Sequence, residues 1–271
     1  MKKTGRNRII SDKFYTLPTI ALECIQKFKK YLPKNMSGSL LIEPSAGNGA
    51  FLAQLSDSPI LAFDIEPAGG NIIRQDFLQL DLDHFDKKLF FIGNPPFGRQ
   101  ASLARKFVKH IAKCPHTQLI AFILPKSFKK KSFQKTFPLQ FHLMETWDIP
   151  DNSFTIGGNA HNVPCVFQIW QKMEKKRIIL PPPIAKYFTF VKKEGFPDFS
   201  LRRVGVYAGK LDAECTSKSS QSHYFIKLGS NILPHAFEAQ YKTLQFEHNN
   251  TVGPKSISKP EFILAINTLV L

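Results

Sequence analysis

Asn94, Pro95, Pro96 and Phe97 follow one another directly after a short apolar run, and together they could bind an amine. An amine conjugated to a ring is a poor nucleophile because its lone pair is delocalised. The side-chain oxygen of Asn94 and the carbonyl oxygen of Pro95 could accept both of its hydrogens and turn the nitrogen toward tetrahedral geometry. The prolines stiffen the loop, and Phe97 offers a face for stacking. Such catalysis uses positioning and electrostatics, without metal or covalent intermediate; alone, the four residues could equally be a rigid turn.

Three further loops carry residues that could hold a nucleoside. The segment 43–51 (Glu-Pro-Ser-Ala-Gly-Asn-Gly-Ala-Phe) is rich in small residues, which let a backbone approach a ligand closely, and we expect it to open a helix. Asp64 follows the next apolar run, where nucleoside-binding α/β folds hold a ribose diol. Asp76 could accept from an adenine amino group while Phe77 covers the ring. Each acid alone could instead be a helix N-cap or a solvated charge.

These loops must be positioned by strands and helices that alternate along the chain. Near-continuous apolar runs indicate strands buried on both faces, hence a parallel sheet covered by helices. The last two strands leave no room for a crossover helix, so we expect them to be antiparallel neighbours. The pattern predicts an α/β fold with a doubly wound, seven-stranded, mostly parallel Rossmann-like sheet. We expect strands at 40–42, 60–63, 71–74, 89–92, 119–124, 141–149 and 163–171, and helices at 16–31, 101–113 and 127–136.

The composition changes after residue 172. The charged run 173–177 is followed at a short distance by the prolines 181–183. We therefore expect one domain at 1–175 and a small α+β appendage at 176–271 that is accessory or recognises substrate.

The loop 43–51 resembles the Glu-Pro-x-x-Gly-x-Gly-x-Phe cofactor loop of one family of enzymes, the class I S-adenosylmethionine-dependent methyltransferases that act on adenine N6 through an Asn-Pro-Pro-Phe motif. The segment 14–18 (Phe-Tyr-Thr-Leu-Pro) is similar to the family's N-terminal motif, whose threonine meets the methionine carboxylate. The family has Thr-Pro directly, whereas Leu17 intervenes here. The resemblance covers residues 12–172 and says little about the rest.

The resemblance implies S-adenosyl-L-methionine as the cofactor. Glu43 and the backbone of 46–49 would hold its methionine end, Asp64 its ribose, and Asp76 with Phe77 its adenine. In full, the implied cofactor residues are Tyr15, Thr16, Glu43, Ser45, Ala46, Gly47, Gly49, Asp64, Ile65, Asp76, Phe77 and Asn94, and the implied catalytic residues are Asn94, Pro95, Pro96 and Phe97.

The implied reaction is methylation of adenine N6 in nucleic acid, with the target base flipped out or unpaired. The motif order and the N-terminal threonine segment favour DNA slightly, while the small C-terminal region leaves an RNA adenine methyltransferase open. Protein glutamine methyltransferases use a similar motif, usually with tyrosine, and both Phe97 and the basic charge argue against them. A non-catalytic nucleic-acid-binding subunit with a decayed methyltransferase fold is the remaining alternative, which the intact motif set disfavours.

Two segments could contact the substrate besides Phe97. The first, 126–135, interleaves lysines with phenylalanines after the fifth strand, which suits phosphates; it could instead be a solvated helix face with two core phenylalanines. The second is the loop between the last two strands, where Phe154 could stack on the base or anchor the loop in the core. The candidate residues are Phe97, Lys126, Lys129, Lys130, Lys131 and Phe154.

The whole-chain composition agrees with a polyanionic partner. The formal net charge is +16 over 271 residues, which favours binding of nucleic acid, DNA or RNA, although a basic protein without that role is the alternative. The four cysteines are far apart without a Cys-x-x-Cys pair, so we expect free thiols in a reducing compartment and no metal site. No run is long enough to span a bilayer and the basic N-terminus has no apolar segment behind it, so we expect an intracellular protein. Nothing in the sequence indicates an oligomeric state.

Overall fold

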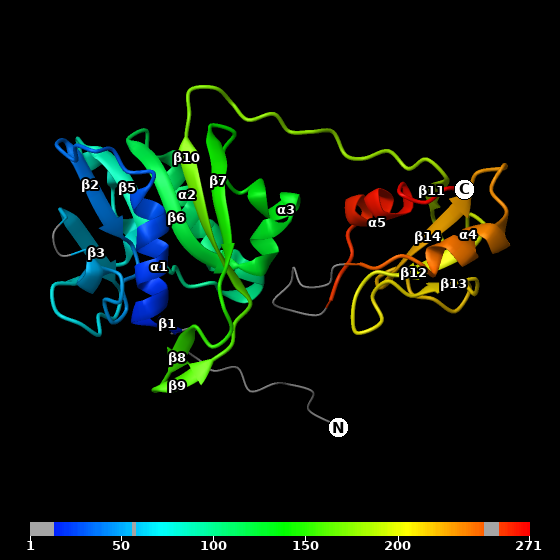
Figure 1. The fold of residues 1–271 in the computed structure, drawn as a ribbon, viewed down its shortest axis with the longest axis horizontal. Coiled ribbons are helices and arrows are strands. Elements are labelled where there is room, and N and C mark those ends of the chain that lie inside the picture. The colour runs from blue at the N-terminus through cyan, green and yellow to red at the C-terminus, as the bar shows by residue number, and fades with distance from the viewer. Residues whose placement is uncertain (1–13, 56–57, 247–254) are drawn as a thin grey trace. The chain divides into compact units, whose positions relative to one another are not determined.

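The computed structural model describes residues 14–55, 58–246 and 255–271, which form two compact units. The first unit is Met1–Ile178 and the second Ile179–Leu271, a few residues beyond the expected boundary (Figure 1). The basic N-terminal residues 1–8, on which the expectation of no secretory signal depended, lie outside the described residues.

A seven-stranded sheet forms the first unit, as expected from the apolar runs. Its order is β4-β3-β2-β5-β6-β10-β7. Neighbours from β4 to β6 are parallel, and β10 is antiparallel to both β6 and β7, which confirms the antiparallel pairing of the last two strands. The strands are β2 (Ser39–Glu43), β3 (Ile60–Asp64), β4 (Ile73–Arg74), β5 (Lys88–Gly93), β6 (Thr117–Pro125), β7 (Phe141–Asp148) and β10 (Cys165–Lys172).

Helices cover both faces of this sheet because alternate strand residues supply two separate cores. Helix α1 (Pro18–Lys29) buries Ile25 and Phe28 in one core with Leu41 of β2. Helix α2 (Ser102–Lys113) packs in the other core with Ile42 of the same strand. Figure 1 shows α1 lying along the sheet. Successive strand residues therefore face opposite helices, as a doubly wound sheet requires.

The sheet order places β2 beside β5, and this pairing determines where the loops meet. Both strands run parallel, with Leu41 opposite Phe90. The loops that leave β2, β3, β4 and β5 consequently emerge at one edge of the sheet, the crevice where α/β folds bind ligands.

Two helix expectations were wrong. Within the described residues the loop 43–51 leads only to a 3-10 turn, η1 (Leu52–Gln54), because β3 begins at Ile60 and leaves too little chain for a helix. The expected helix 127–136 is divided into η5 (Lys126–Lys129) and α3 (Lys131–Gln134), with Lys130 extended between them. Residues five apart on one regular helix would face different directions, and the break lets Phe128 and Phe133 pack against one core.

A small antiparallel sheet lies beside the N-terminus of α1. It is formed by β1 (Tyr15–Thr16), β8 (Phe154–Ile156) and β9 (Asn159–His161). Thr16 pairs with Phe154, and the amide of Leu17 donates to the carbonyl of Ser153 at 3.1 Å. Three short 3-10 turns complete the connections of the unit: η2 (Phe77–Gln79), η3 (Leu82–His84) and η4 (Arg99–Ala101).

In its described residues, 179–246 and 255–271, the second unit combines a four-stranded antiparallel sheet with two helices. The sheet order is β11-β14-β12-β13, and Phe199, Ile226, Phe237 and Phe262 lie in its core. A capping box between Ser258 and Glu261 begins the last helix. The elements are β11 (Phe188–Val191), β12 (Phe199–Arg202), β13 (Leu211–Asp212), β14 (His223–Leu228), α4 (Pro234–Tyr241) and α5 (Lys259–Ile266).

Three further findings bear on function. All four cysteines are buried free thiols. Over residues 14–55, 58–246 and 255–271, no helix has the length and apolar character needed to cross a membrane. The same residues contain no cluster of His, Cys, Asp or Glu that could hold a metal ion.

Candidate functional site

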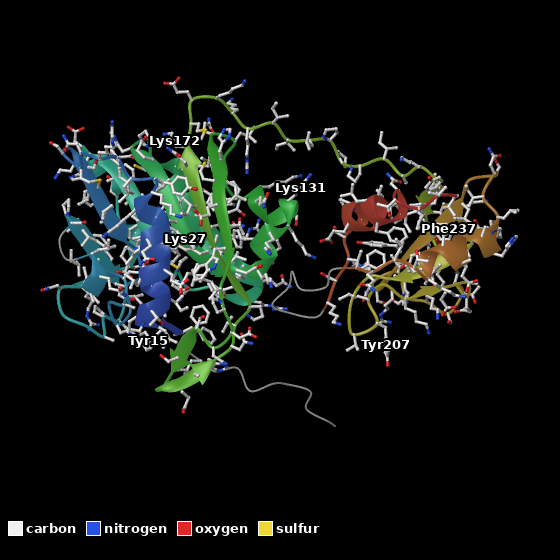
Figure 2. The ribbon with its side chains drawn as sticks, in the orientation of Figure 1. Tyr15, Lys27, Lys131, Lys172, Tyr207 and Phe237 are labelled. Carbon is white, nitrogen blue, oxygen red and sulfur yellow. The ribbon has the colours of Figure 1, made fainter. Side chains whose placement is uncertain are left out.

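A pocket of about 720 Å³ lies at the edge where the loops after β2, β3, β4 and β5 meet. It is lined by Phe14, Tyr15, Pro44, Ser45, Gly47, Asp64, Ile65, Glu66, Gln75, Asp76, Phe77, Leu78, Asn94, Pro95, Pro96, Phe97, Leu103 and Phe107. Figure 2 labels Tyr15 at this end of the first unit, beside the small sheet. The strand order thus brings together all four loops in which chemistry was expected.

The pocket contains most of the residues that the sequence singled out. The expected residues that line it are Tyr15, Ser45, Gly47, Asp64, Ile65, Asp76, Phe77, Asn94, Pro95, Pro96 and Phe97. Those that do not line it are Thr16, Glu43, Ala46, Gly49, Lys126, Lys129, Lys130, Lys131 and Phe154.

Both amide hydrogens of Asn94 are used within the protein. Its Nδ2 donates to the carbonyl oxygen of Phe14 at 3.3 Å and to Oγ1 of Thr16 at 3.2 Å. The hydroxyl of Ser45 donates to the backbone carbonyl oxygen of Asn94 at 3.2 Å. No hydrogen bond from a described residue reaches Oδ1, so this oxygen is available as an acceptor in the pocket.

The loop after Asn94 is held in an unusual backbone conformation. Gly98 has φ of 65°, and a Cβ there would lie 2.9 Å from Cβ of Leu103. Gln100 and Ala101 also have positive φ, at 52° and 58°. The carbonyl oxygen of Phe97 accepts from the amides of Leu103 and Ala104. Strain of this kind persists only where surrounding contacts over-determine it, so the position of Phe97 is tightly specified.

Asp64 joins two of the loops. Its Oδ2 accepts from the amide of Gly47 at 2.7 Å and its Oδ1 from that of Glu66 at 2.8 Å. Gly47 has φ of 55°, and a Cβ there would lie 3.1 Å from the Tyr15 ring, so the ring would have to shift slightly. Each carboxylate oxygen retains a second lone pair that could accept from a ribose hydroxyl.

Asp76 is an N-cap, the alternative that the sequence had left open. Its Oδ1 accepts from the amide of Leu78 at 3.0 Å, which begins the turn η2. Phe77 touches the pocket, but it is 2% exposed and its ring stacks on that of Phe107 at 5.8 Å. It is therefore mainly a core residue, and only a small part of the ring could cover a ligand.

Glu43 is buried at the end of β2, next to the lining residue Pro44. Its Oε2 has no hydrogen-bond partner among the described residues. Burial raises the pKa of this carboxyl well above its usual 4.5. A cationic or N–H group placed against Oε2 would satisfy this buried oxygen.

Two expected contact residues lie elsewhere in the structure. Thr16 is 5% exposed and bonds to Asn94 instead of lining the pocket. Phe154 is 1% exposed, because its pairing with β1 places it in the core, so it presents no face to a base. It is the loop anchor that had been the alternative.

The lysine segment does not line the pocket either. Lys126 and Lys129 both pair with Asp148 of β7, at 3.8 and 2.8 Å, so their charges are partly neutralised. Lys131 is exposed on α3 (Figure 2). The sequence could not show that Asp148 lies near these lysines, because β7 and the segment after β6 are brought together by β10, which lies between β6 and β7 in the sheet.

Some pocket residues were missed at the sequence level. Glu66 and Gln75 each lie within two residues of an aspartate that was identified, so a wider window would have found them. Leu103 and Phe107 are four apart on α2 and share a face, the usual sign of packing. Phe14, Pro44 and Leu78 adjoin motif residues but carry no chemical signal of their own.

Comparison with known proteins gives likenesses of low identity. No protein-family model matches the sequence, and no curated protein matches it. Among solved structures, the chain is similar to the 23S rRNA methyltransferase ErmE, with a TM-score of 0.43 and 14% identity over 61% of this chain and 72% of that one. It is also similar to the M protein of the type I restriction enzyme EcoKI, with a TM-score of 0.42 and 17% identity over 60% of this chain and 45% of that one. For Trm5b from Pyrococcus abyssi the TM-score is 0.39 and the identity 16%, over 59% and 51% of the two chains.

Proposed function

We propose that the chain is a class I S-adenosylmethionine-dependent methyltransferase that methylates adenine N6 in nucleic acid. One observation carries the proposal: Asn94, with Oδ1 available as an acceptor, shares a single pocket with Asp64 and Asp76. An amine acceptor and two carboxylates suited to a nucleoside are the parts that such a reaction needs, and they come from three different strands.

The residues present fit S-adenosylmethionine. Glu43 does not line the pocket but adjoins the lining residue Pro44, and its Oε2, which has no partner among the described residues, would accept from the ammonium. The left-handed Gly47 lets the backbone approach the ligand closely. Asp64 would accept from the ribose hydroxyls and Asp76 from the adenine amine. When bound, this cofactor supplies an electrophilic methyl group.

The protein's own contribution to the reaction is to position the amine. Oδ1 of Asn94 and the carbonyl oxygen of Pro95 would accept its two hydrogens and direct the nitrogen lone pair outward. Pro95 is buried and Pro96 stiffens the next bond, so the acceptors need no reorganisation. Neither Asn94 nor Pro95 can take up a proton, so the proton lost from the methylated nitrogen passes to solvent.

The target base would lie against Phe97. This side chain is half-buried, lines the pocket and packs on both cores of the unit. A ring held that firmly can stack on a base with little entropy cost. Lys131 is our remaining candidate from the lysine segment for a phosphate contact, whereas Lys126 and Lys129 would first have to leave Asp148.

We propose further that the second unit binds nucleic acid. Phe190, Tyr224, Lys192, Lys193 and Lys259 border a shallow hollow of about 320 Å³. Nζ of Lys259 lies 4.4 Å from the Phe190 ring centre and 5.8 Å from that of Tyr224. In the described residues none of the three lysines is paired with a carboxylate. Lysines beside aromatic rings suit a phosphate next to a base.

The test is methyl transfer from labelled S-adenosylmethionine to panels of DNA, RNA and protein. We expect label in nucleic acid, recovered as N6-methyladenine, more from DNA than from RNA. The substitution Asn94→Ala should lower the rate of methyl transfer about 100- to 1,000-fold, since it removes an acceptor used in the transition state. Asn162→Ala, which changes an exposed asparagine of the same unit, is the matched control.

Other outcomes would overturn parts of the proposal. Label found only in protein would identify the glutamine methyltransferase alternative. Equal activity of the Asn94→Ala variant would refute the role of Asn94. Absence of S-adenosylmethionine binding in calorimetry would leave a nucleic-acid-binding subunit.

A further inference from the structure

We infer that the segment Phe14–Thr16 holds the Asn94 amide in one orientation, and that Thr16 is a positioning residue which does not contact the cofactor. The inference rests on the proposed function for its catalytic consequence, but its structural part concerns the free protein alone.

The Asn94 amide group is fully committed on its nitrogen side. An amide carries two N–H hydrogens, and here one is accepted by the Phe14 carbonyl and the other by Oγ1 of Thr16. If the side-chain amide turned by half a rotation, Oδ1 would face the Phe14 carbonyl oxygen, which cannot donate, and that hydrogen bond would be lost. The Thr16 hydroxyl could reverse and donate to Oδ1, so it is the Phe14 carbonyl that opposes the flip. The flipped orientation is therefore disfavoured, and Oδ1 is kept on the side where an amine hydrogen would approach.

Thr16 contacts Asn94 and is not placed to contact a ligand in the pocket. Its side chain is buried, it does not line the pocket, and its backbone pairs with Phe154 of the hairpin β8–β9. The neighbouring amide of Leu17 donates to Ser153, which fixes the strand from its other end. Its hydroxyl therefore acts through Asn94.

The hairpin supports this arrangement from the far side. Phe154 is buried beneath the strand, and the Phe14 ring lies edge-on to His161 of β9, with 5.6 Å between ring centres. The pairing of β1 with β8, about 140 residues later in the chain, thus helps to fix the side-chain amide of Asn94. This explains why Phe154 is buried although the loop that carries it adjoins the site.

The resemblance noted above implied a different role, in which the threonine meets the methionine carboxylate. The two roles predict different effects of removing the Thr16 hydroxyl. A cofactor contact would strengthen cofactor binding, whereas a positioning residue would raise the rate at saturating cofactor.

The experiment compares Thr16→Val, which keeps the shape and removes the acceptor, with Thr16→Ser, which keeps the acceptor. For Thr16→Val we expect kcat to fall about 10- to 100-fold while the Kd for S-adenosylmethionine, measured by calorimetry, changes less than about twofold. Thr16→Ser should restore most of kcat. A tenfold weaker Kd with unchanged kcat in Thr16→Val would overturn the inference.

A second readout needs no substrate. In protein labelled with ¹⁵N-asparagine, the Asn94 side-chain resonances are assigned by their loss in Asn94→Ala. We expect both hydrogens to exchange slowly in the wild-type protein and in Thr16→Ser, and one to exchange faster in Thr16→Val. Identical exchange in all three proteins would refute the orienting role. If the wild-type protein transferred no methyl group, the proposed function would fail, but this measurement would still decide the inference.

Discussion

Glu43 and Asp64 end neighbouring strands but have opposite environments. Asp64 accepts two backbone N–H groups, whereas Oε2 of Glu43 has no partner in the described part of the chain. Burial raises the pKa of Glu43, and the charge of Asp64 adds to that effect. Burial therefore disfavours the ionised form of Glu43, and a cation placed against it would favour that form.

This environment gives Glu43→Gln a pH-dependent effect on stability. A carboxyl whose folded pKa is raised contributes stability that is complete below about pH 4.5 and is lost as the pH rises through the folded pKa. Glutamine does not titrate, so the variant does not lose this stability. Its free energy of unfolding minus that of the wild type should therefore increase between pH 5 and pH 8. Urea denaturation at four pH values measures the difference.

The control for that measurement is Asp151→Asn, which removes an exposed carboxylate of the same unit. The Glu43→Gln difference is compared with that of Asp151→Asn at the same four pH values. If Glu43→Gln behaved in the same way, Glu43 would be ionised or hydrated in the free protein.

At the scale of elements, the site is a set of loops positioned by the pairing of β2 with β5 and β3. No single loop is sufficient, since the acceptor of Asn94 and the carboxylates of Asp64 and Asp76 come from different strands. The loop after β5 is the most constrained, because positive φ angles follow Phe97 and the Phe97 carbonyl bonds to the start of α2.

Gly98→Ala tests this constraint, and Gly38→Ala is its matched control. Both glycines have φ near 70°, which a side chain rarely adopts, so each substitution should cost about 1–3 kcal/mol of stability. Only at Gly98 would the new methyl also meet Leu103, at 2.9 Å, while nothing lies within 4 Å at Gly38. We expect both variants to melt at lower temperature but only Gly98→Ala to lose kcat. Equal kcat in the two would mean that the loop conformation does not position Phe97.

At the scale of the whole molecule, the lysines that contribute to the net charge of +16 differ in whether a carboxylate neutralises them. Lys126 and Lys129 are paired with Asp148, and Lys218 lies 2.8 Å from Asp212. Within residues 14–55, 58–246 and 255–271, the lysines beside Phe190 and Tyr224 have no carboxylate partner, so they are the better candidates for phosphate binding.

The triple variant Lys192→Gln, Lys193→Gln, Lys259→Gln tests this placement. We expect weaker binding of a labelled oligonucleotide by fluorescence anisotropy, with the salt dependence reduced by about one counterion per lysine. The control neutralises the exposed Lys186, Lys210 and Lys227 of the same unit. An equal loss in both triple variants would show that only net charge matters.

Much of the fold was accessible from local pattern. Seven strands, the antiparallel pair at the end and helices α1 and α2 follow from apolar runs and helical spacing, because each reflects burial along one element. The division of 127–136 did not follow, since Phe128 and Phe133 pack on a common core that only the folded chain creates.

The order of residue types along the chain was enough to locate the loop Asn94–Phe97 after one strand and the carboxylates Asp64 and Asp76 after two others. Only the tertiary structure decided the partners of these groups: Thr16 at the Asn94 amide, Phe154 in the core and Asp148 beside the lysines. The physical reason is that motifs depend on neighbours in the chain, whereas burial and hydrogen bonding depend on segments that strand pairing brings together across more than a hundred residues.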